Sequence, residues 1–254
     1  MKVLTVYAHP SPKSFCHAIL EQFSRGLRDA GHTYEIVDLY AIGFDPVFRD
    51  RDAPNWIDET IPQDLLDRGD LKQDVIDRSG GPLRRFLTRR WIRDKDARAI
   101  IRMLREHHRP KDVLEQQRKI AGADGLAFIA PVWFVGYPAI LKGWIERVFT
   151  LGFAFGLSEA GWHGEVRGRI PLLKHRKALI ISTTLFDEET YRAGFGEAMG
   201  RLMDDWGLRY PGIQNVEHVY FYSVYGASDE ARRAYLERAY LLGLNFDASR
   251  AAAA

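Results

Sequence analysis

Short apolar segments alternate with amphipathic helical patterns along most of this chain. The first segment, residues 2–8, is β-branched and almost wholly apolar, which is typical of a parallel strand covered on both faces. Residues 15–30 then repeat apolar side chains at helical spacing, and Gly31 is well placed to end that helix. The alternation predicts an α/β protein with a doubly wound parallel sheet. Further strands are expected at residues 34–39, 125–130, 178–182 and 216–223, and further helices at 112–121, from 138 onward, around 194–206 and at 229–242.

Residues 50–110 interrupt this alternation. Strand patterns vanish there, charged residues crowd in, and proline or glycine recurs. We expect a largely helical insertion into a single domain of residues 1–254, with residues 83–108 as its most regular helix. This helix would carry a large apolar face, which we expect to pack against another surface. That surface is either a neighbouring subunit or the functional site. The apolar residues of that helix are Leu83, Phe86, Leu87, Trp91, Ile92, Ile100, Ile101 and Leu104.

The insertion is also rich in arginine. Ten basic residues fall between Arg84 and Arg109, and some can pair with Asp94, Asp96 or Glu106. Such a run is typical of a solvated helix face. The alternatives are contact with an acidic partner, a bound phosphate or a neighbouring subunit.

Composition and charge restrict the classes of partner. The chain has 36 basic and 34 acidic residues, so nothing in the overall charge demands a nucleic acid. The single cysteine, Cys16, cannot form an internal disulfide, which favours a reducing compartment. The N-terminal apolar run is too short for a signal peptide, and no stretch approaches the ~20 apolar residues of a membrane span. We expect a cytoplasmic protein with no membrane insertion. No metal site is expected, because the adjacent His107 and His108 point to different helix faces.

The first strand is followed by a polar loop, residues 9–15, that leads into a helix. This loop supplies hydroxyl groups, a lysine and the amides of a helix N-terminus, which readily receive a phosphate. It matches neither GxGxxG nor GxxxxGK[ST], which argues against a Rossmann dinucleotide site and a nucleoside-triphosphate hydrolase. The structural alternative is a helix capped by Ser14 with no ligand.

The loop at residues 131–138 carries three aromatic side chains between a buried strand and a helix. Such a loop suits a flat apolar ligand whose polar edge is bound by loop amides. The structural alternative is an aromatic plug that packs against the insertion. A third loop, residues 182–186, places Thr183 and Thr184 directly after a strand, where hydroxyls and amides can meet a ligand ring. Threonine pairs are common at strand ends, so this signal is weak by itself.

Four stretches of the chain resemble the NAD(P)H quinone reductase family of flavodoxin-like proteins. That family includes DT-diaphorase, the bacterial modulators of drug activity and the ancillary oxidoreductases of glutathione-gated potassium efflux. The resemblance covers residues 1–48 and 112 to about 191, and it implies a flavodoxin-like fold with a longer insertion than the family usually has. The stretches are YAHPSPKSF (7–15), DLYAIGFDPVF (38–48), APVWFVGYPAILKGWIERVF (130–149) and STT (182–184).

The resemblance also implies a flavin site and a reaction. The expected activity is flavin-dependent NAD(P)H:quinone oxidoreduction, in which NAD(P)H reduces the flavin, leaves, and a quinone-like, nitro or azo acceptor enters the same site. The chain length favours FAD, with FMN as the alternative, and Lys13 with the arginine-rich helix hints at NADPH. A homodimer is expected because the family builds its acceptor site at a subunit boundary. The implied cofactor-binding residues are His9, Ser11, Ser14, Phe15 and Cys16 at the phosphate, Pro131, Val132, Trp133 and Phe134 along the ring, and Thr183, Thr184 and Leu185 near its pyrimidine side.

Two departures from the family pattern concern the acceptor side of the site. Many members have two glycines after the threonines, whereas this chain has Leu185 and Phe186. Tyr191 occupies the position of a family catalytic tyrosine, but no histidine matches its usual companion. A regulatory flavoprotein that gates a membrane transporter is therefore an alternative function. A small electron-carrier flavodoxin fits less well, because such carriers are usually acidic and lack a large insertion.

Overall fold

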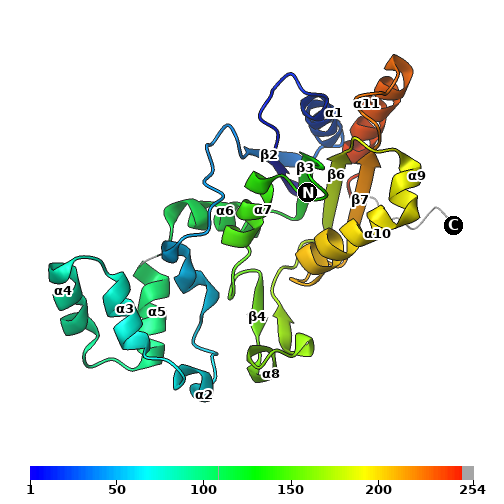
Figure 1. Cartoon of the computed structure of the whole chain (residues 1–254). Helices are drawn as coiled ribbons and strands as arrows, with labels where there is room; N and C mark the ends of the chain where they lie inside the picture. Colours follow the sequence, from blue (N-terminus) through cyan, green and yellow to red (C-terminus); the bar gives the residue numbers. More distant parts are fainter. Residues whose placement is uncertain (108, 248–254) are drawn as a thin grey trace.

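The computed structural model describes residues 1–107 and 109–247. Its centre is a parallel five-stranded sheet in the order β2-β1-β3-β6-β7 (Figure 1). The strand order reverses between β1 and β3, and ligands of open parallel sheets bind near such a point, at the carboxyl ends of the strands. The doubly wound parallel sheet expected from the sequence is confirmed. The strands are β1 (Lys2–Tyr7), β2 (Thr33–Asp38), β3 (Gly125–Pro131), β6 (Lys177–Thr183) and β7 (Val216–Phe221).

Helices cover both faces of the sheet because its central strands are apolar on both sides. Every residue of β3 and β6 is buried. One face packs on α1 and α11 through residues such as Val3 and Phe23, and the other packs on α6 and α7 through residues such as Leu4 and Trp144. These helices are α1 (Phe15–Asp29), α6 (Lys111–Ala121), α7 (Ala139–Val148) and α11 (Asp229–Leu244).

The insertion forms an arm of short helices that projects from the body (Figure 1). The single helix expected at residues 83–108 is wrong, because the chain breaks at residues 93–96. The Asp96 carboxylate accepts a hydrogen bond from the Ala99 amide at 2.7 Å and so begins a new helix. His108 lies outside the described residues. The arm contains η1 (Asp50–Trp56), α2 (Gln63–Leu66), α3 (Leu71–Arg78), α4 (Pro82–Ile92) and α5 (Ala97–His107).

The break divides the expected apolar stripe between two environments. Ile92 and Ile100 are buried in a small cluster with Ile76 of α3, whereas Leu83 and Phe86 of α4 are exposed. The eight apolar side chains expected on one helix face therefore do not form a single apolar surface. Part of them is the core of the arm, and part faces solvent.

The glycine-rich segment after α7 folds into a small antiparallel hairpin of β4 (Phe155–Leu157) and β5 (Arg169–Pro171), with α8 (Glu159–Trp162) and η2 (Val166–Gly168) between them. This hairpin packs against the arm, where the rings of Trp56 and Phe155 lie 5.9 Å apart. Between β6 and β7 the chain forms α9 (Glu188–Thr190), η3 (Tyr191–Phe195), α10 (Gly196–Met199) and η4 (Gly200–Arg209). The helix expected around residues 194–206 is thus longer and bent, with Gly194 at a φ of 123°.

Candidate active site

The loop between β1 and α1 ends in a capped helix that still offers donors to a ligand. The Ser14 hydroxyl accepts a hydrogen bond from the His17 amide at 3.1 Å. Among the described residues, the amides of Phe15 and Cys16 have no acceptor, as the first turn of a helix requires. His9 turns back on the loop, since its Nδ1 accepts a hydrogen bond from the Ser11 amide at 3.0 Å. Burial lowers the pKa of His9, which favours this neutral form.

The loop between β3 and α7 is a strained two-residue turn. Trp133 and Gly136 pair through both of their backbone groups, at 3.1 and 3.3 Å. The two residues between them, Phe134 and Val135, have left-handed φ values of 43° and 61°. Such a conformation costs of order 1–3 kcal/mol for each residue and clusters at functional sites. The Phe134 ring is fully exposed, so the aromatic plug considered from the sequence does not form.

The loop after β6 keeps its threonines inside and its apolar side chains outside. Thr183 and Thr184 are buried, and the Thr184 hydroxyl donates a hydrogen bond to the Phe186 carbonyl at 2.7 Å. Leu185 and Phe186, the two residues that follow these threonines, are exposed. Their side chains therefore project from the loop instead of filling the space beside the threonines.

These three loops meet at the carboxyl edge of the sheet. The rings of His9 and Trp133 lie 5.7 Å apart, which joins the first loop to the second. The Val132 amide donates to the Thr183 carbonyl at 2.8 Å, which joins the second to the third. Cys16 reaches the third loop from α1: burial raises the pKa of its thiol to about 12, against the opposing effect of a hydrogen bond with Thr183. The thiol therefore stays protonated and acts as a packing and hydrogen-bonding group.

Tyr191 lies at the start of η3, behind the third loop, and its side chain is buried. Its ring contacts those of Tyr220 and Tyr222, with centroids 4.7 and 5.3 Å away. Burial raises the pKa of Tyr191 to about 12. Its buried hydroxyl makes no hydrogen bond of full geometry in the described part of the chain, although the Thr184 side chain is close enough to oppose this rise in pKa. A buried hydroxyl that is poorly hydrogen-bonded is costly, and a ligand oxygen is one group that would satisfy it.

A buried polar network next to Tyr191 was missed by the sequence analysis. His218 Nδ1 lies 2.9 Å from an Asp204 carboxylate oxygen, and His218 Nε2 lies 2.9 Å from the Ser182 hydroxyl. Since a carboxylate only accepts, Nδ1 carries the proton, and in the neutral ring Nε2 accepts from Ser182. Ser182 is 2% exposed, so the triad-like order of these groups gives no substrate access to the serine. The His218 ring stacks on that of Tyr220 at 4.1 Å, which connects the network to Tyr191.

The only sequence signal for this network is the alternation of His218, Tyr220 and Tyr222 on one face of a strand. Asp204 completes it from η4, which follows β6 by many residues, so spacing alone does not bring the two together. The sequence offered no companion histidine beside Tyr191, and in the structure a histidine from another element, His218, lies beyond the ring of Tyr220.

Residues 1–241 match the family described as "Flavodoxin-like fold". The chain belongs to the flavodoxin-like family. The flavodoxin-like fold expected from the resemblance is therefore confirmed.

Two kinds of relative were found among flavodoxin-like proteins. "Ribosyldihydronicotinamide dehydrogenase-like protein traD" of Penicillium crustosum is 32% identical over 185 residues, which are 72% of this chain and 57% of that protein. The matched region thus spans little more than half the length of that relative. Among solved structures, the NAD(P)H:quinone oxidoreductase from Methanothermobacter marburgensis has a TM-score of 0.66 at 28% identity, with 98% of both chains covered. These relatives confirm the resemblance to NAD(P)H quinone reductases.

A more distant flavodoxin-like structure contains a bound cofactor. It is an FMN-dependent NADH-azoreductase from Bacillus anthracis str. Ames Ancestor, solved in complex with FMN. Its TM-score is 0.62 at 14% identity, and the match covers 96% of this chain and 98% of that one. At that identity the likeness shows the shared fold alone.

An apolar cavity of about 250 Å³ adjoins the strained turn of this flavodoxin-like chain. The turn supplies Val135 and Tyr137, α7 supplies Lys142 at the rim, and the bent helices supply Met199 and Met203. Burial raises the pKa of Tyr137 well above its usual value, so this tyrosine stays neutral. The cavity gives the second loop an apolar wall on the side of α7 and η4.

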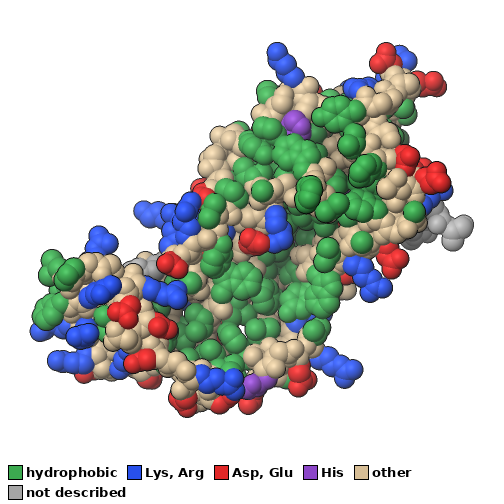
Figure 2. Space-filling model, in the orientation of Figure 1, with side chains coloured by type: hydrophobic (Ala, Val, Ile, Leu, Met, Phe, Trp, Pro, Cys, Tyr) green, Lys and Arg blue, Asp and Glu red, His purple; other side chains and the backbone are tan. Residues whose placement is uncertain are grey.

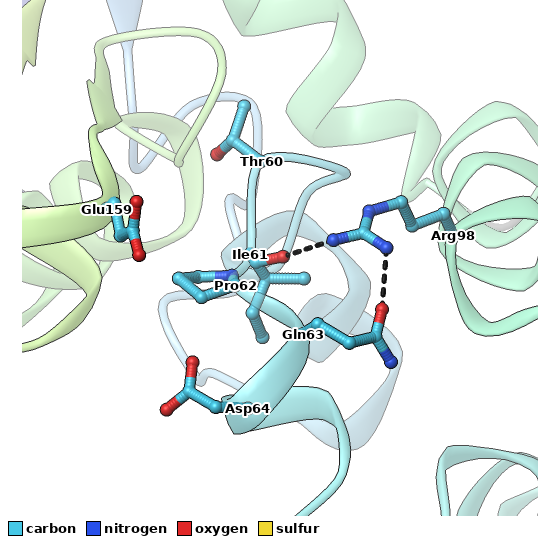
Figure 3. Close-up of a pocket in the computed structure, with 7 residues that line it drawn as sticks. All are labelled: Thr60, Ile61, Pro62, Gln63, Asp64, Arg98 and Glu159. Atoms are coloured by element: carbon cyan, nitrogen blue, oxygen red, sulfur yellow. Dashed lines mark hydrogen bonds between the residues drawn. The ribbon is translucent and has the colours of Figure 1, made fainter.

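A larger hollow of about 450 Å³ lies between the arm and the hairpin, away from the strand ends (Figure 3). Arg98 enters it from α5 and donates to the Ile61 carbonyl at 3.1 Å and to the Gln63 side chain at 2.7 Å. Asp64 of α2 and Glu159 of α8 also line it (Figure 3). Arg98, the one basic residue in its lining, is already hydrogen-bonded within the arm. We therefore interpret this hollow as a gap where the arm and the hairpin meet. It does not belong to the site at the sheet edge.

In the described ranges, no three His, Cys, Asp or Glu side chains come together as metal ligands do. Within residues 1–107 and 109–247, no helix is long and apolar enough to cross a bilayer.

Proposed function

We propose that this chain is a flavin-dependent NAD(P)H:quinone oxidoreductase that also accepts azo or nitro compounds. The observation that carries the proposal is the meeting of three strand-end loops at the topological switch point of the sheet, where open α/β folds bind their ligands. The names of the relatives support the reaction class. Because the matched region covers only 57% of the fungal relative, we infer the activity from the geometry of the site as well as from the relatives.

The residues present fit a phosphate-bearing planar cofactor. We propose that the amides of Phe15 and Cys16, with Ser11, Ser14 and His9, hold the phosphate at the positive end of α1. Pro131 to Phe134 would lie along the ring, and residues 183–185 would meet its polar edge. The Tyr191 hydroxyl supports the fit, since only a loose contact with Thr184 engages it among the described residues and a ligand oxygen would complete its hydrogen bonding. When bound, the flavin supplies the hydride and electron transfer, and the protein supplies binding, orientation and electrostatics.

The proposed cofactor is FAD, with FMN as the alternative, and NADPH is the proposed electron donor. The length of the chain supports FAD, while the FMN complex of the distant azoreductase supports the alternative. Extraction of the cofactor from purified protein and one chromatographic comparison with FAD and FMN decides between them.

We also propose a cytoplasmic homodimer whose partner chain covers the site. Trp133, Phe134, Leu185 and Phe186 are all exposed around the same edge of the sheet. A cluster of exposed aromatic and aliphatic side chains at a site marks a surface for another molecule. A second copy placed there would remove these side chains from water and shape the acceptor side of the pocket.

The proposal is tested by spectroscopy and by one assay. Purified protein is expected to be yellow and to oxidise NADPH or NADH when menadione is added. Protein that is colourless, and that gains no flavin absorbance after incubation with either FAD or FMN, would overturn the proposal. The measurement to make first is the visible spectrum, because it does not depend on the choice of acceptor.

Replacement of Tyr191 by phenylalanine should separate catalysis from folding. Its hydroxyl makes no hydrogen bond of full geometry among the described residues, so its loss should change the melting temperature little. If that hydroxyl contacts the reacting groups, turnover with menadione should fall about tenfold, equivalent to ~1.4 kcal/mol of transition-state stabilisation. Tyr222→Phe, which alters a neighbouring ring of the same cluster, is the control. Equal turnover of Tyr191→Phe and the wild-type chain would remove Tyr191 from the mechanism.

A further inference from the structure

Helix α4 presents an apolar face to solvent at the far end of the arm. Leu83, Phe86 and Leu87 are 70, 63 and 54% exposed, and Trp91 is 44% exposed. Figure 2 shows hydrophobic side chains beside basic ones at the left end of the molecule, where α4 lies in Figure 1. Soluble monomers rarely expose so many large apolar side chains in one place, so this face fits a contact with another body.

The same helix is strongly cationic. It and its C-cap carry Arg84, Arg85, Arg89, Arg90 and Arg93 and no acidic residue. Arg93 pairs with its neighbour Asp94 at 3.4 Å. For Arg84, Arg89 and Arg90, no ion pair forms with any residue in the described ranges. The positive charge of α4 is therefore left for an outside partner.

The helix attaches to the arm by its opposite side. Ile92 is 1% exposed and packs against Ile76 of α3 and Ile100 of α5. At 100° per residue, the four exposed apolar residues lie on the side away from Ile92, with Arg90 among them and Arg84 and Arg93 at the borders. An arginine within such a face can bury its stem while its guanidinium reaches a polar layer.

We propose that α4 is a membrane-surface anchor that lies flat on an anionic lipid bilayer. Leucine, phenylalanine and tryptophan on one face, with arginine at its borders, is the composition of helices that lie in the headgroup region. The apolar side chains enter the boundary of the acyl chains, and the arginines contact the anionic headgroups. This is a peripheral contact that requires no membrane-spanning helix. It would bring the arm-bearing enzyme to lipid-dissolved quinones, a consequence that alone depends on the proposed function.

A second copy of the chain is the main competing occupant. A two-fold axis through the α4 face would place Arg90 of one chain against the arginines of the other, and like charges at an interface oppose association. An anionic bilayer instead complements every charge on the helix. The charge of α4 therefore favours the lipid surface.

The test is co-sedimentation of the flavin-loaded full chain with vesicles. One vesicle is phosphatidylcholine alone, and the other has a third of its lipid replaced by phosphatidylglycerol. Wild-type protein is expected to bind the anionic vesicles and to be released by salt. The variant Arg84→Gln/Arg89→Gln/Arg90→Gln should lower the partition coefficient roughly 100-fold. The variant Leu83→Ser/Phe86→Ser/Leu87→Ser should lower it roughly tenfold or more.

The matched control removes the same charge from other surfaces. Arg28→Gln/Arg167→Gln/Arg233→Gln changes three exposed arginines on other elements and should bind within about twofold of wild type. Each variant is checked for unchanged reduction of a water-soluble quinone, so a failure of the proposed activity is seen separately from a failure of binding. Equal binding of all variants, or none by the wild type, overturns the anchor. So does a wild-type oligomer that ignores vesicles and dissociates in the α4 variants, which would assign the face to a second copy.

Discussion

Replacement of Arg147 by leucine is expected to lower the free energy of unfolding by about 3–5 kcal/mol. Arg147 lies on α7 with its side chain fully buried, and its Nε donates to the Asp52 carboxylate at 3.0 Å. Its Nη1 donates to Asp112 and to the Asp45 carbonyl, both at 2.7 Å. Without the guanidinium, the Asp52 carboxylate would remain buried with no opposing charge, and this uncompensated charge is the source of the expected loss.

Chemical denaturation of the variant and wild type measures this loss. Lys142→Leu on the same helix is the matched control, because Lys142 pairs with Glu146 at the surface and should contribute under about 1 kcal/mol. The double variant Arg147→Leu/Asp52→Asn should be more stable than Arg147→Leu alone, since it leaves no buried charge at Asp52. A loss for Arg147→Leu as small as that of the surface control would show that the buried pair does not hold the base of the arm.

The arm is therefore attached by a contact that the sequence did not reveal. Asp52 and Arg147 are far apart along the chain, and neither stands in a pattern that marks it as buried. Arginine in the last turn of a helix is usually read as a solvated residue. Asp52 and Arg147 become a buried ion pair only because η1 packs against α7.

The central sheet could be predicted because its signal is local. The segments that became β3 and β6 are short apolar runs, and strands buried on both faces need no other pattern. A helix was expected from residue 138 onward, and α7 begins there with Pro138 as its N-cap. The three site loops were found for a related reason, since strand ends fix where the loops must meet.

The parts that the sequence did not reveal depend on contacts between distant residues. The break at residues 93–96 falls inside a continuous helical pattern, and it forms because α5 turns back to bury Ile100 against α3 and α4. The hairpin of β4 and β5 lies in a segment where we expected no strand, and its contact with the arm comes through Trp56. The network of His218, Asp204 and Ser182 joins three separate elements.

The strained turn at Phe134 and Val135 shows how the site differs from the rest of the fold. Elsewhere in the sheet, local preference and tertiary packing agree, as in the apolar strands. Here two side chains occupy left-handed conformations that asparagine or glycine would adopt more easily. Natural proteins break local rules mainly at functional sites, so the strain supports the second loop as part of the proposed ring site.

Replacement of Ser14 by aspartate is expected to weaken flavin binding roughly 100-fold or more while the fold keeps its stability. Aspartate caps a helix about as well as serine does, so the hydrogen bond from the His17 amide should persist. The new carboxylate would stand at the helix start proposed to bind the phosphate. Two like charges near contact repel by about 3–4 kcal/mol in a partly screened site, which corresponds to that change in Kd.

Asparagine at the same position is the decisive control, because it caps equally well and carries no charge. Ser14→Asn should retain flavin through gel filtration, Ser14→Asp should lose it, and the two flavin-free proteins should melt at similar temperatures. Because shape and capping are matched, any difference in flavin content between the two variants measures charge alone. Flavin bound equally by both would move the phosphate away from the start of α1, and the first loop would then be a capped helix with no role in the site.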